Sequence, residues 1–178
     1  MKRSCYACLI SFVFVGLVSC GGSPINSAHT PVVATKDSAK VLELLPKGKS
    51  IGLEKTNVPG DVVVETINGN TFDQAHVKTI PYGRDVVLSG WAVDLSSRQC
   101  ASGVDVVIAG KPYNASKYGL ERSDVARYLK HDAYKKSGFQ FTIPAGGLSY
   151  GSHEIIMRVL SPDGKRFGEG GKISIRIE

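Results

Sequence analysis

The side chains that could catalyse a reaction or bind a metal are few and widely spaced in this sequence. His131-Asp132 and His153-Glu154 are separate pairs, and neither has the His-Glu-x-x-His spacing that places two imidazoles around a zinc ion. The sequence has no Gly-x-Ser-x-Gly nucleophile elbow and no glycine-rich phosphate loop. Asp94 and Asp105 could meet across strands, but nothing selects this pair over other acids. We therefore expect no catalytic residue, no metal site and no cofactor.

The clearest chemical signal is a cysteine that follows a short apolar segment. Lys2 and Arg3 form a basic start, an apolar run covers residues 9–17, and Leu17-Val18-Ser19-Cys20 ends it. The run is shorter than the roughly 20 residues of a bilayer-spanning helix and has the length of a secretory signal core. Residues 21–24 contain Gly, Gly, Ser and Pro, which stop a helix and disfavour a permanent membrane anchor helix.

The Leu-Val-Ser-Cys ending resembles the lipobox of bacterial lipoproteins. In that family a diacylglycerol is transferred to the cysteine sulfur and the signal is cut just before this residue, because a thiolate is a good nucleophile at neutral pH. The resemblance implies a signal peptide over residues 1–19, lipidation of Cys20 and a membrane partner held through acyl chains. It also implies a place in the cell envelope. In a Gram-negative host Gly21 favours the outer membrane, since lipoproteins kept in the inner membrane often have Asp there.

Cleavage before Cys20 would change the cysteine chemistry of the chain. Two of the four cysteines lie within residues 1–19, and Cys20 would become a thioether. Cys100 would then be the only free thiol and could form no intramolecular disulfide. We expect a buried or slow thiol at Cys100, with an intermolecular disulfide or a reactive role as the alternative. The net charge of +6 is spread without long runs of Lys or Arg, so we expect no nucleic-acid partner.

The rest of the chain divides into a tether and a β-rich domain. Residues 20–60 are rich in Ser, Thr, Pro and Lys, which predicts a mostly disordered tether, with a short docking helix over residues 37–45 as one interruption. Residues 61–178 contain short alternating apolar runs separated by turn sequences such as Asn68-Gly69. About seven such strands predict an all-β, antiparallel Ig-like β-sandwich. One short helix is expected over residues 123–130, capped by its first Ser or Asp.

Alternation along the strands predicts which side chains face the core. Gly90 is expected at a bulge or a close-packing point of its strand. The residues that we place mostly inside are Val87, Trp91, Val93, Val106, Ile108, Phe139, Phe141, Ile155, Met157, Ile173 and Ile175.

Two segments suggest more than a generic sandwich. Gly90-Trp-Ala-Val-Asp94 is one, and Tyr118-Gly-Leu-Glu-Arg-Ser-Asp-Val-Ala126, followed by Ser137-Gly-Phe139, is the other. Together they resemble an Ig-like β-sandwich module of bacterial envelope proteins, which is found chiefly at the extracytoplasmic end of multi-pass membrane proteins. The resemblance covers about residues 62–177. The module carries no established activity, so it assigns no catalytic or binding residue.

Four residues of these segments are candidates for binding a ligand or for ordering a loop. Trp91 is predicted to anchor the core, and the alternative is a platform on which sugar rings stack. Tyr118, Arg122 and Asp124 could line a polar pocket around a ligand. We favour the second account, in which Arg122 and Asp124 fix the path of a loop that crosses one end of the sandwich.

Two functions remain open from the sequence. The first is a structural or assembly subunit that docks onto an envelope protein through a sheet edge or its tether, and it predicts a buried Trp91 and an exposed apolar face around Ile156 and Leu160. The second is a binding module for an envelope glycan or peptide, and it predicts an exposed Trp91 or a groove near Tyr118.

Overall fold

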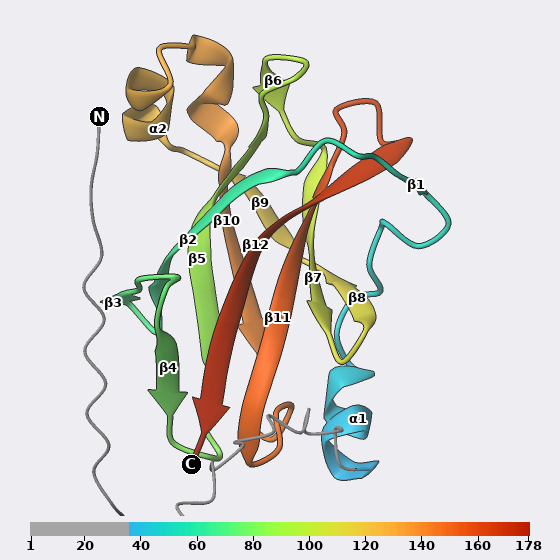
Figure 1. The fold of residues 1–178 in the computed structure, drawn as a ribbon, viewed down its shortest axis with the longest axis vertical. Coiled ribbons are helices and arrows are strands. Elements are labelled where there is room, and N and C mark those ends of the chain that lie inside the picture. Colours follow the sequence, from blue (N-terminus) through green and yellow to red (C-terminus); the bar gives the residue numbers. More distant parts are fainter. Residues whose placement is uncertain (1–35) are drawn as a thin grey trace, which may run out of the picture. The chain divides into compact units, whose positions relative to one another are not determined.

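The structure is a computed structural model of the chain, and it describes residues 36–178. These residues form two β-sheets packed against each other, with short helices at opposite ends (Figure 1). This confirms the all-β sandwich that the alternating apolar residues predict. The described residues contain twelve strands, because five short strands join the seven that the alternation predicts.

The first sheet, sheet A, has the strand order β1-β12-β11-β7-β8, and β4 also pairs with β12. β1 and β4 run parallel to β12 at its beginning and its end, and the other pairs are antiparallel. Pro112 lies within β8, where an edge position tolerates its missing N–H. The strands are β1 (Glu54–Lys55), β4 (Val77–Ile80), β7 (Gly103–Ile108), β8 (Lys111–Asn114), β11 (Gly151–Leu160) and β12 (Arg166–Ile177).

The second sheet, sheet B, has the order β3-β2-β5-β10-β9, and β6 also pairs with β5. Its strands are β2 (Asp61–Ile67), β3 (Asn70–Thr71), β5 (Val86–Asp94), β6 (Gln99–Cys100), β9 (Lys117–Leu120) and β10 (Gly138–Ile143). Asn68 and Gly69 join β2 to β3 with φ angles of 52° and 74°, as expected for the two central residues of a tight hairpin turn.

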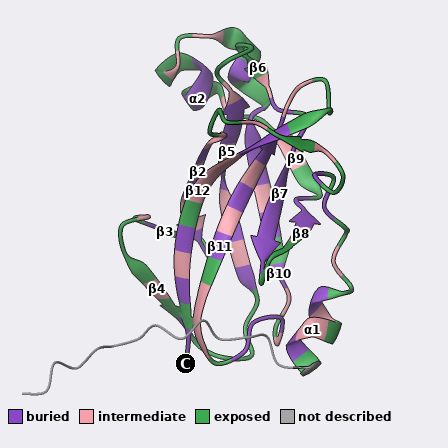
Figure 2. Cartoon of the chain, turned by 45° about the vertical axis from the view of Figure 1, so that its right-hand side comes forward, coloured by how far each residue is buried: buried purple, intermediate pink, exposed green. Residues whose placement is uncertain are grey.

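The main core lies between the two sheets and draws on both. Figure 2 shows buried residues alternating with less buried ones along β11 and β12, which is the pattern of strands with one face inside. Eight of the predicted core residues belong to this cluster: Val106, Ile108, Phe139, Phe141, Ile155, Met157, Ile173 and Ile175.

The predicted orientation of β5 is wrong by one residue. Val86, Leu88 and Ala92 face the main core, so Val87 and Trp91, both half-buried, lie on the outer face of sheet B. Val93 is buried, but in a second cluster on that outer face. Both faces of β5 carry apolar side chains, and a shift of one residue exchanges the two faces completely.

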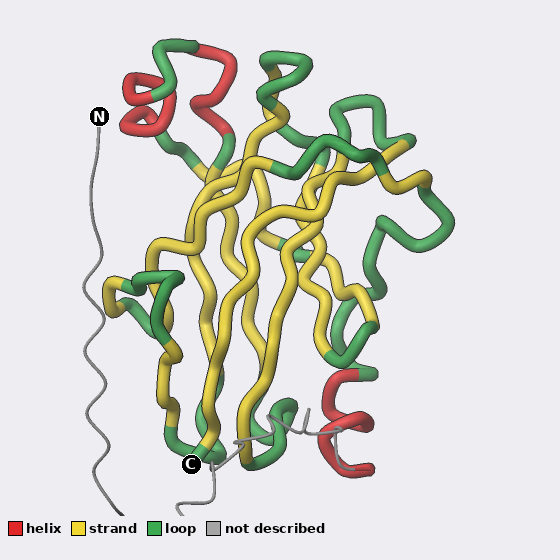
Figure 3. The backbone as a smooth tube through the Cα atoms, in the orientation of Figure 1, coloured by secondary structure: helices red, strands yellow, loops and turns green. Residues whose placement is uncertain are grey.

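A helical cap, formed by α2 (Ser123–Tyr128) and the 3-10 helix η1 (Asp132–Lys136), lies between β9 and β10 in sequence. Figure 3 shows it at the end of the sandwich opposite α1 (Lys36–Leu42). The helix predicted over residues 123–130 is confirmed, although it is shorter. Its expected cap by Ser123 or Asp124 is wrong, because the N-cap residue is Arg122 and makes no side-chain capping bond.

Residues 36–60 pack on the domain, which corrects the predicted tether that ends at residue 60. Leu42 of α1 is buried in the main core, and β1 pairs with β12. Gly48 and Gly60 donate backbone hydrogen bonds to Pro112 and Glu169. We call this segment the strap. It is held by backbone pairing and polar contacts, so its polar composition does not reveal that it is ordered.

Candidate functional site

Trp91 lies on the outer face of sheet B, beneath the helical cap. It is half-buried and packs against a cluster of Val93, Val125, Ala126 and Tyr134, which β5, α2 and η1 contribute. The sequence predicted that Trp91 anchors the main core, and the structure corrects this prediction. Trp91 joins the cap to the sheet instead.

Arg122 connects the cap to the far side of sheet B. Its Nη1 and Nη2 donate to the two carboxylate oxygens of Glu65 over 2.7 and 2.9 Å, and its Nε and Nη2 donate to Asp124 over 2.9 and 2.6 Å. Glu65 lies on β2, whereas Arg122 follows β9, so the ion pair joins segments of sheet B that β5 and β10 separate in the strand order. We call Arg122, Glu65 and Asp124 the clamp. Planar pairing of this kind is the geometry that arginine provides.

Glu65 reaches the clamp because β2 has a bulge at this position. The pairing register with β5 shifts between Val64 and Thr66, which leaves Glu65 as the extra residue. Glu65 was not among the residues predicted from the sequence. A carboxylate inside the run Val62-Val-Val-Glu-Thr-Ile67 was the one signal that could have indicated it.

The charges of the clamp stabilise one another. Hydrogen bonds from Arg122 lower the pKa of Asp124 to about 2, and bonds to Asp124 and then Glu65 raise the pKa of Arg122 above its ordinary value. Arg122 and Asp124 are thus both ionised at neutral pH, and neither is suited to transfer protons. The clamp therefore ties the start of α2 to β2.

Tyr118 lies on the opposite face of sheet B from the clamp. It pairs with Phe139, packs against the main core and donates its hydroxyl to the carbonyl of Ala92 over 2.9 Å. Burial raises the pKa of the Tyr118 hydroxyl. The predicted polar pocket of Tyr118, Arg122 and Asp124 is therefore not formed, because the sheet separates the tyrosine from the other two.

Arg122→Ala should lower the free energy of unfolding by about 1–3 kcal/mol, because it leaves two carboxylates without their partner. Arg127→Ala, on the exposed face of the same helix, is the matched control and should change stability by less than about 0.5 kcal/mol. Urea unfolding of both variants measures the difference.

The effect of Arg122→Ala should also depend on pH. The folded pKa of Asp124 is below its ordinary 3.8, so its contribution is complete above that value and is lost as the pH falls toward 2. The gap in stability between wild type and variant should therefore narrow below about pH 4. If the difference in stability between wild type and variant widened on acidification, the stabilising role of the clamp would be contradicted.

Trp91→Ala should cost about 2 kcal/mol, less than for a fully buried core aromatic, because only part of the ring is covered. Trp91 is the only tryptophan, so its fluorescence reports on the cap directly. We expect quenching by iodide that is intermediate between a free and a shielded indole. Complete shielding, or quenching equal to that of a free indole, would show that the cap is packed differently.

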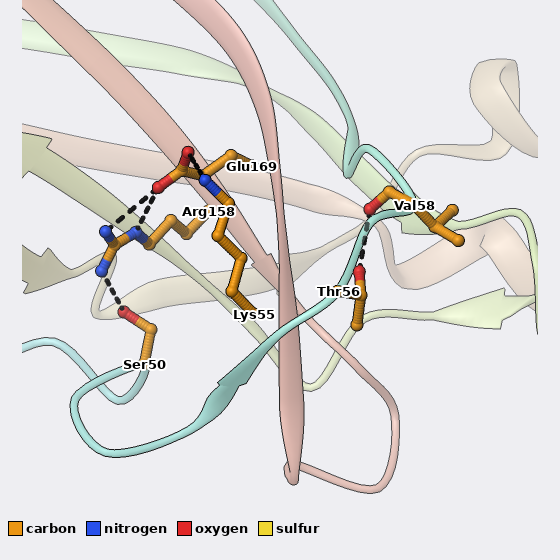
Figure 4. A network of polar contacts seen from close by, with 6 residues as sticks. All are labelled: Ser50, Lys55, Thr56, Val58, Arg158 and Glu169. Carbon is orange, nitrogen blue, oxygen red and sulfur yellow. Dashed lines mark hydrogen bonds and ion pairs between the residues drawn. The ribbon is translucent and has the colours of Figure 1, made fainter.

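A second polar network fastens the strap to sheet A. Arg158 donates to Glu169 through Nε and Nη2 over 3.2 and 3.1 Å and to the Ser50 hydroxyl over 3.4 Å, and Lys55 of the strap pairs with Glu169 (Figure 4). The Arg158 guanidinium also lies over the ring of Phe167, 4.5 Å from its centroid. The ion pair of Lys55 and the hydrogen bond to Ser50 hold the strap to the outer face of this sheet, and the cation–π contact positions Arg158 on it.

Asp105 supplies a buried contact to the same strap. Its side chain is fully buried, and its two oxygens accept hydrogen bonds from the backbone N–H of Ser50 over 2.6 Å and from Nδ2 of Asn114 over 3.0 Å. A buried carboxylate needs such partners to be tolerated. Asp105 therefore stabilises the strap and does not meet Asp94 as an acid pair.

An open groove lies near the end of the sandwich where the chain also ends. Its volume is about 870 Å³, and its lining consists of Asn68, Gly69, Tyr82, Gly83, Arg84, Asp85, Val87 and Ala145. Tyr82 is 46% exposed and stacks on Tyr150, which is 62% exposed, with ring centroids 4.3 Å apart. This groove could not be predicted from the sequence, because 67 residues separate the two tyrosines and neither belongs to a known motif.

The remaining predicted positions have simple outcomes. Cys100 is half-exposed and forms no disulfide, and its thiol donates a hydrogen bond to the carbonyl of Ala133 over 3.0 Å. Cys20 and residues 1–19 lie outside the described residues. Within residues 36–178, no group of three His, Cys, Asp or Glu side chains could hold a metal ion. Across that same part of the chain, no helix is long and apolar enough to cross a membrane.

Comparisons with known proteins give a distant structural similarity. No protein-family model and no curated protein matches this chain. The crystal structure of domains 4 and 5 of the S-layer protein SbsC is similar over 66% of this chain and 53% of that chain, with 14% identity and a TM-score of 0.31. The chain thus spans about half the length of the structure it matches.

Proposed function

We propose that the chain is a bacterial envelope lipoprotein, held to a membrane through acyl groups on Cys20, whose β-sandwich is a non-catalytic structural or assembly subunit. The lipobox-like ending at Cys20 supports the anchor, and Gly21 favours the outer membrane if the host is Gram-negative. Both rest on the sequence, because this segment is outside the described residues.

The strap is the observation that carries the structural role. The chain that leads away from the proposed anchor does not hang loosely between residues 36 and 60, since Asp105, Arg158 and Glu169 fasten it along sheet A. At most 15 residues, 21–35, then separate Cys20 from the strap, and this linker can span no more than about 55 Å. A domain held this close to its membrane is suited to supporting an assembly there.

The polar side chains of the domain agree with a non-catalytic role. Arg122 is committed to Glu65 and Asp124, and Asp105 to Ser50 and Asn114. These groups have structural partners within the domain, which supports the proposed structural role.

The sequence-based criteria for the two functions are each met only in part. Trp91 is neither fully buried nor freely exposed, and Leu160 is buried. Ile156 is half-buried, between Arg158 and Glu154, which pair with Glu169 and Lys172. The outer face of sheet A is therefore not the exposed apolar surface that we expected of an assembly subunit, and any docking must use another surface.

Cross-linking in intact envelopes tests the assembly role. Cells that express the wild type or Cys20→Ala are cross-linked before detergent extraction, and the products are identified by mass spectrometry. We expect the same envelope protein to be linked to the wild type and to be lost from the variant. Cross-linking that is equal in both proteins would contradict an anchored assembly subunit.

A binding module for an envelope glycan or peptide is the second candidate. The open groove beside Tyr82 favours it, since exposed aromatic and polar side chains lie together there.

A further inference from the structure

The wall of the groove beside Tyr82 is fixed before any ligand arrives. The side-chain oxygen of Asn68 accepts from the N–H of Val87 over 2.7 Å, and its Nδ2 donates to the carbonyl of Asp85 over 3.0 Å. One carboxylate oxygen of Asp85 accepts from the N–H of Ala145 over 2.8 Å. These bonds tie three separate segments together, so binding would cost little ordering of the backbone.

Tyr82 is held in place from behind. Its ring stacks on Tyr150 at an interplanar angle of 17°, and its backbone N–H donates to the carbonyl of Glu178 over 2.7 Å. An exposed tyrosine normally loses side-chain freedom when it binds a partner, but this stacked ring has already lost much of it. The groove therefore has a rigid aromatic wall.

The groove also contains polar groups that the fold does not use. Arg84 is exposed and has no ion-pair or hydrogen-bond partner for its side chain within the described residues. The second carboxylate oxygen of Asp85 has no hydrogen bond in this part of the chain. The other well-placed arginines, Arg122 and Arg158, are both paired, so Arg84 differs from them.

We infer that this groove binds an acidic saccharide, a pyranose ring that bears a carboxylate. The apolar face of the sugar would pack on the ring of Tyr82, and its carboxylate would pair with the planar guanidinium of Arg84. Asp85 would accept hydrogen bonds from sugar hydroxyls. The inference rests on the second of the two proposed functions and names its ligand class.

A saccharide explains the groove better than a lipid surface does. Binding to a membrane interface needs several apolar side chains at the contact, and Val87, which is half-buried, is the only large aliphatic residue in the lining.

Titration of the acylated mature protein in detergent micelles tests the inference. The probes are a muramyl disaccharide and a glucuronate-containing disaccharide, which are acidic sugars from two sources, and chitobiose, which is neutral. Amide chemical shifts are followed by NMR. We expect the amides of Gly69, Gly83 and Ala145 to shift with at least one acidic probe, and the stronger acidic probe indicates the source.

Matched variants show whether the named side chains bind. Tyr82→Ala should weaken binding at least about tenfold, and Tyr82→Phe should retain it. Arg84→Gln should lower the affinity for the acidic probe to the affinity measured for chitobiose. Tyr128→Ala and Arg127→Gln change exposed residues of the helical cap and should have no effect.

Three results would overturn the inference. These are the absence of shifts with all probes at tens of millimolar, equal loss of binding in the cap variants, or shifts of the same amides with anionic lipid alone. The mass of the same sample reports acylation of Cys20, so failure of the anchor and failure of the groove are seen separately.

Discussion

Cys20→Ala should abolish lipidation and release the domain from the membrane. The acyl chains are the only membrane attachment that we propose, and each buried CH₂ contributes about 0.8 kcal/mol, so removal of two or more chains removes essentially all retention. Signal cleavage at the normal position should fail as well, since processing of a lipobox requires the modified cysteine. Fractionation of cells followed by detection of the protein in membrane and aqueous fractions measures the effect.

Cys100→Ala is the matched control for the Cys20 variant. It removes a thiol from the folded domain and leaves the lipobox-like segment intact. We expect it to remain entirely in the membrane fraction. Retention of Cys20→Ala at the wild-type level would show that another part of the chain holds the membrane.

Gly90→Ala should destabilise the domain by about 3 kcal/mol or more. A Cβ at Gly90 would lie 1.9 Å from the carbonyl oxygen of Val63, a backbone atom of the neighbouring strand that cannot rotate away. Sheet B would have to separate or shift at the bulge of β2, and overpacking of a core position by one methyl group typically costs about 1–3 kcal/mol even where side chains can adjust. Urea unfolding measures the loss.

Gly171→Ala is the control for the Gly90 variant. It also places a methyl group in a strand, β12, but its nearest neighbours are the carbonyl oxygen of Val62 at 3.3 Å and the side chain of Gln74 at 3.4 Å. We expect a change of less than about 1 kcal/mol. If the two variants proved equally stable, the close approach of β2 and β5 at Gly90 would be wrong.

The seven main strands and the turns between them could be predicted because their signals are local. Alternation identified Phe139, Phe141 and Ile143 as one face of a strand. The residue types of Asn68-Gly69 identified a hairpin turn. The face of β5 could not be predicted in the same way. Val86, Leu88 and Ala92 on one face and Val87, Trp91 and Val93 on the other are equally apolar, because the cap covers part of the outer face.

The strap escaped prediction because its contacts are not apolar. Lys55 and Ser50 bind residues more than 100 positions away, Glu169 and Arg158, and two-residue strands such as β1 carry no periodic pattern. Composition alone therefore favoured a disordered tether for a segment that the domain fixes.

The candidate site was predicted only where its residues are neighbours in sequence. Arg122 and Asp124 were expected to order the loop together, and they do pair. Their partner Glu65 is 57 positions away and depends on a bulge, and the stack of Tyr82 on Tyr150 depends on two loops that meet at one end of the sandwich. No spacing rule in a single sequence connects residues across such distances.

The intact mass of the protein extracted from membranes tests the central claim most directly. The anchored account predicts a chain that begins at Cys20 and carries the mass of a diacylglycerol, with or without a further acyl group on the new amino terminus. A chain that retains residues 1–19, is cut at another position or carries an unmodified Cys20 would contradict it.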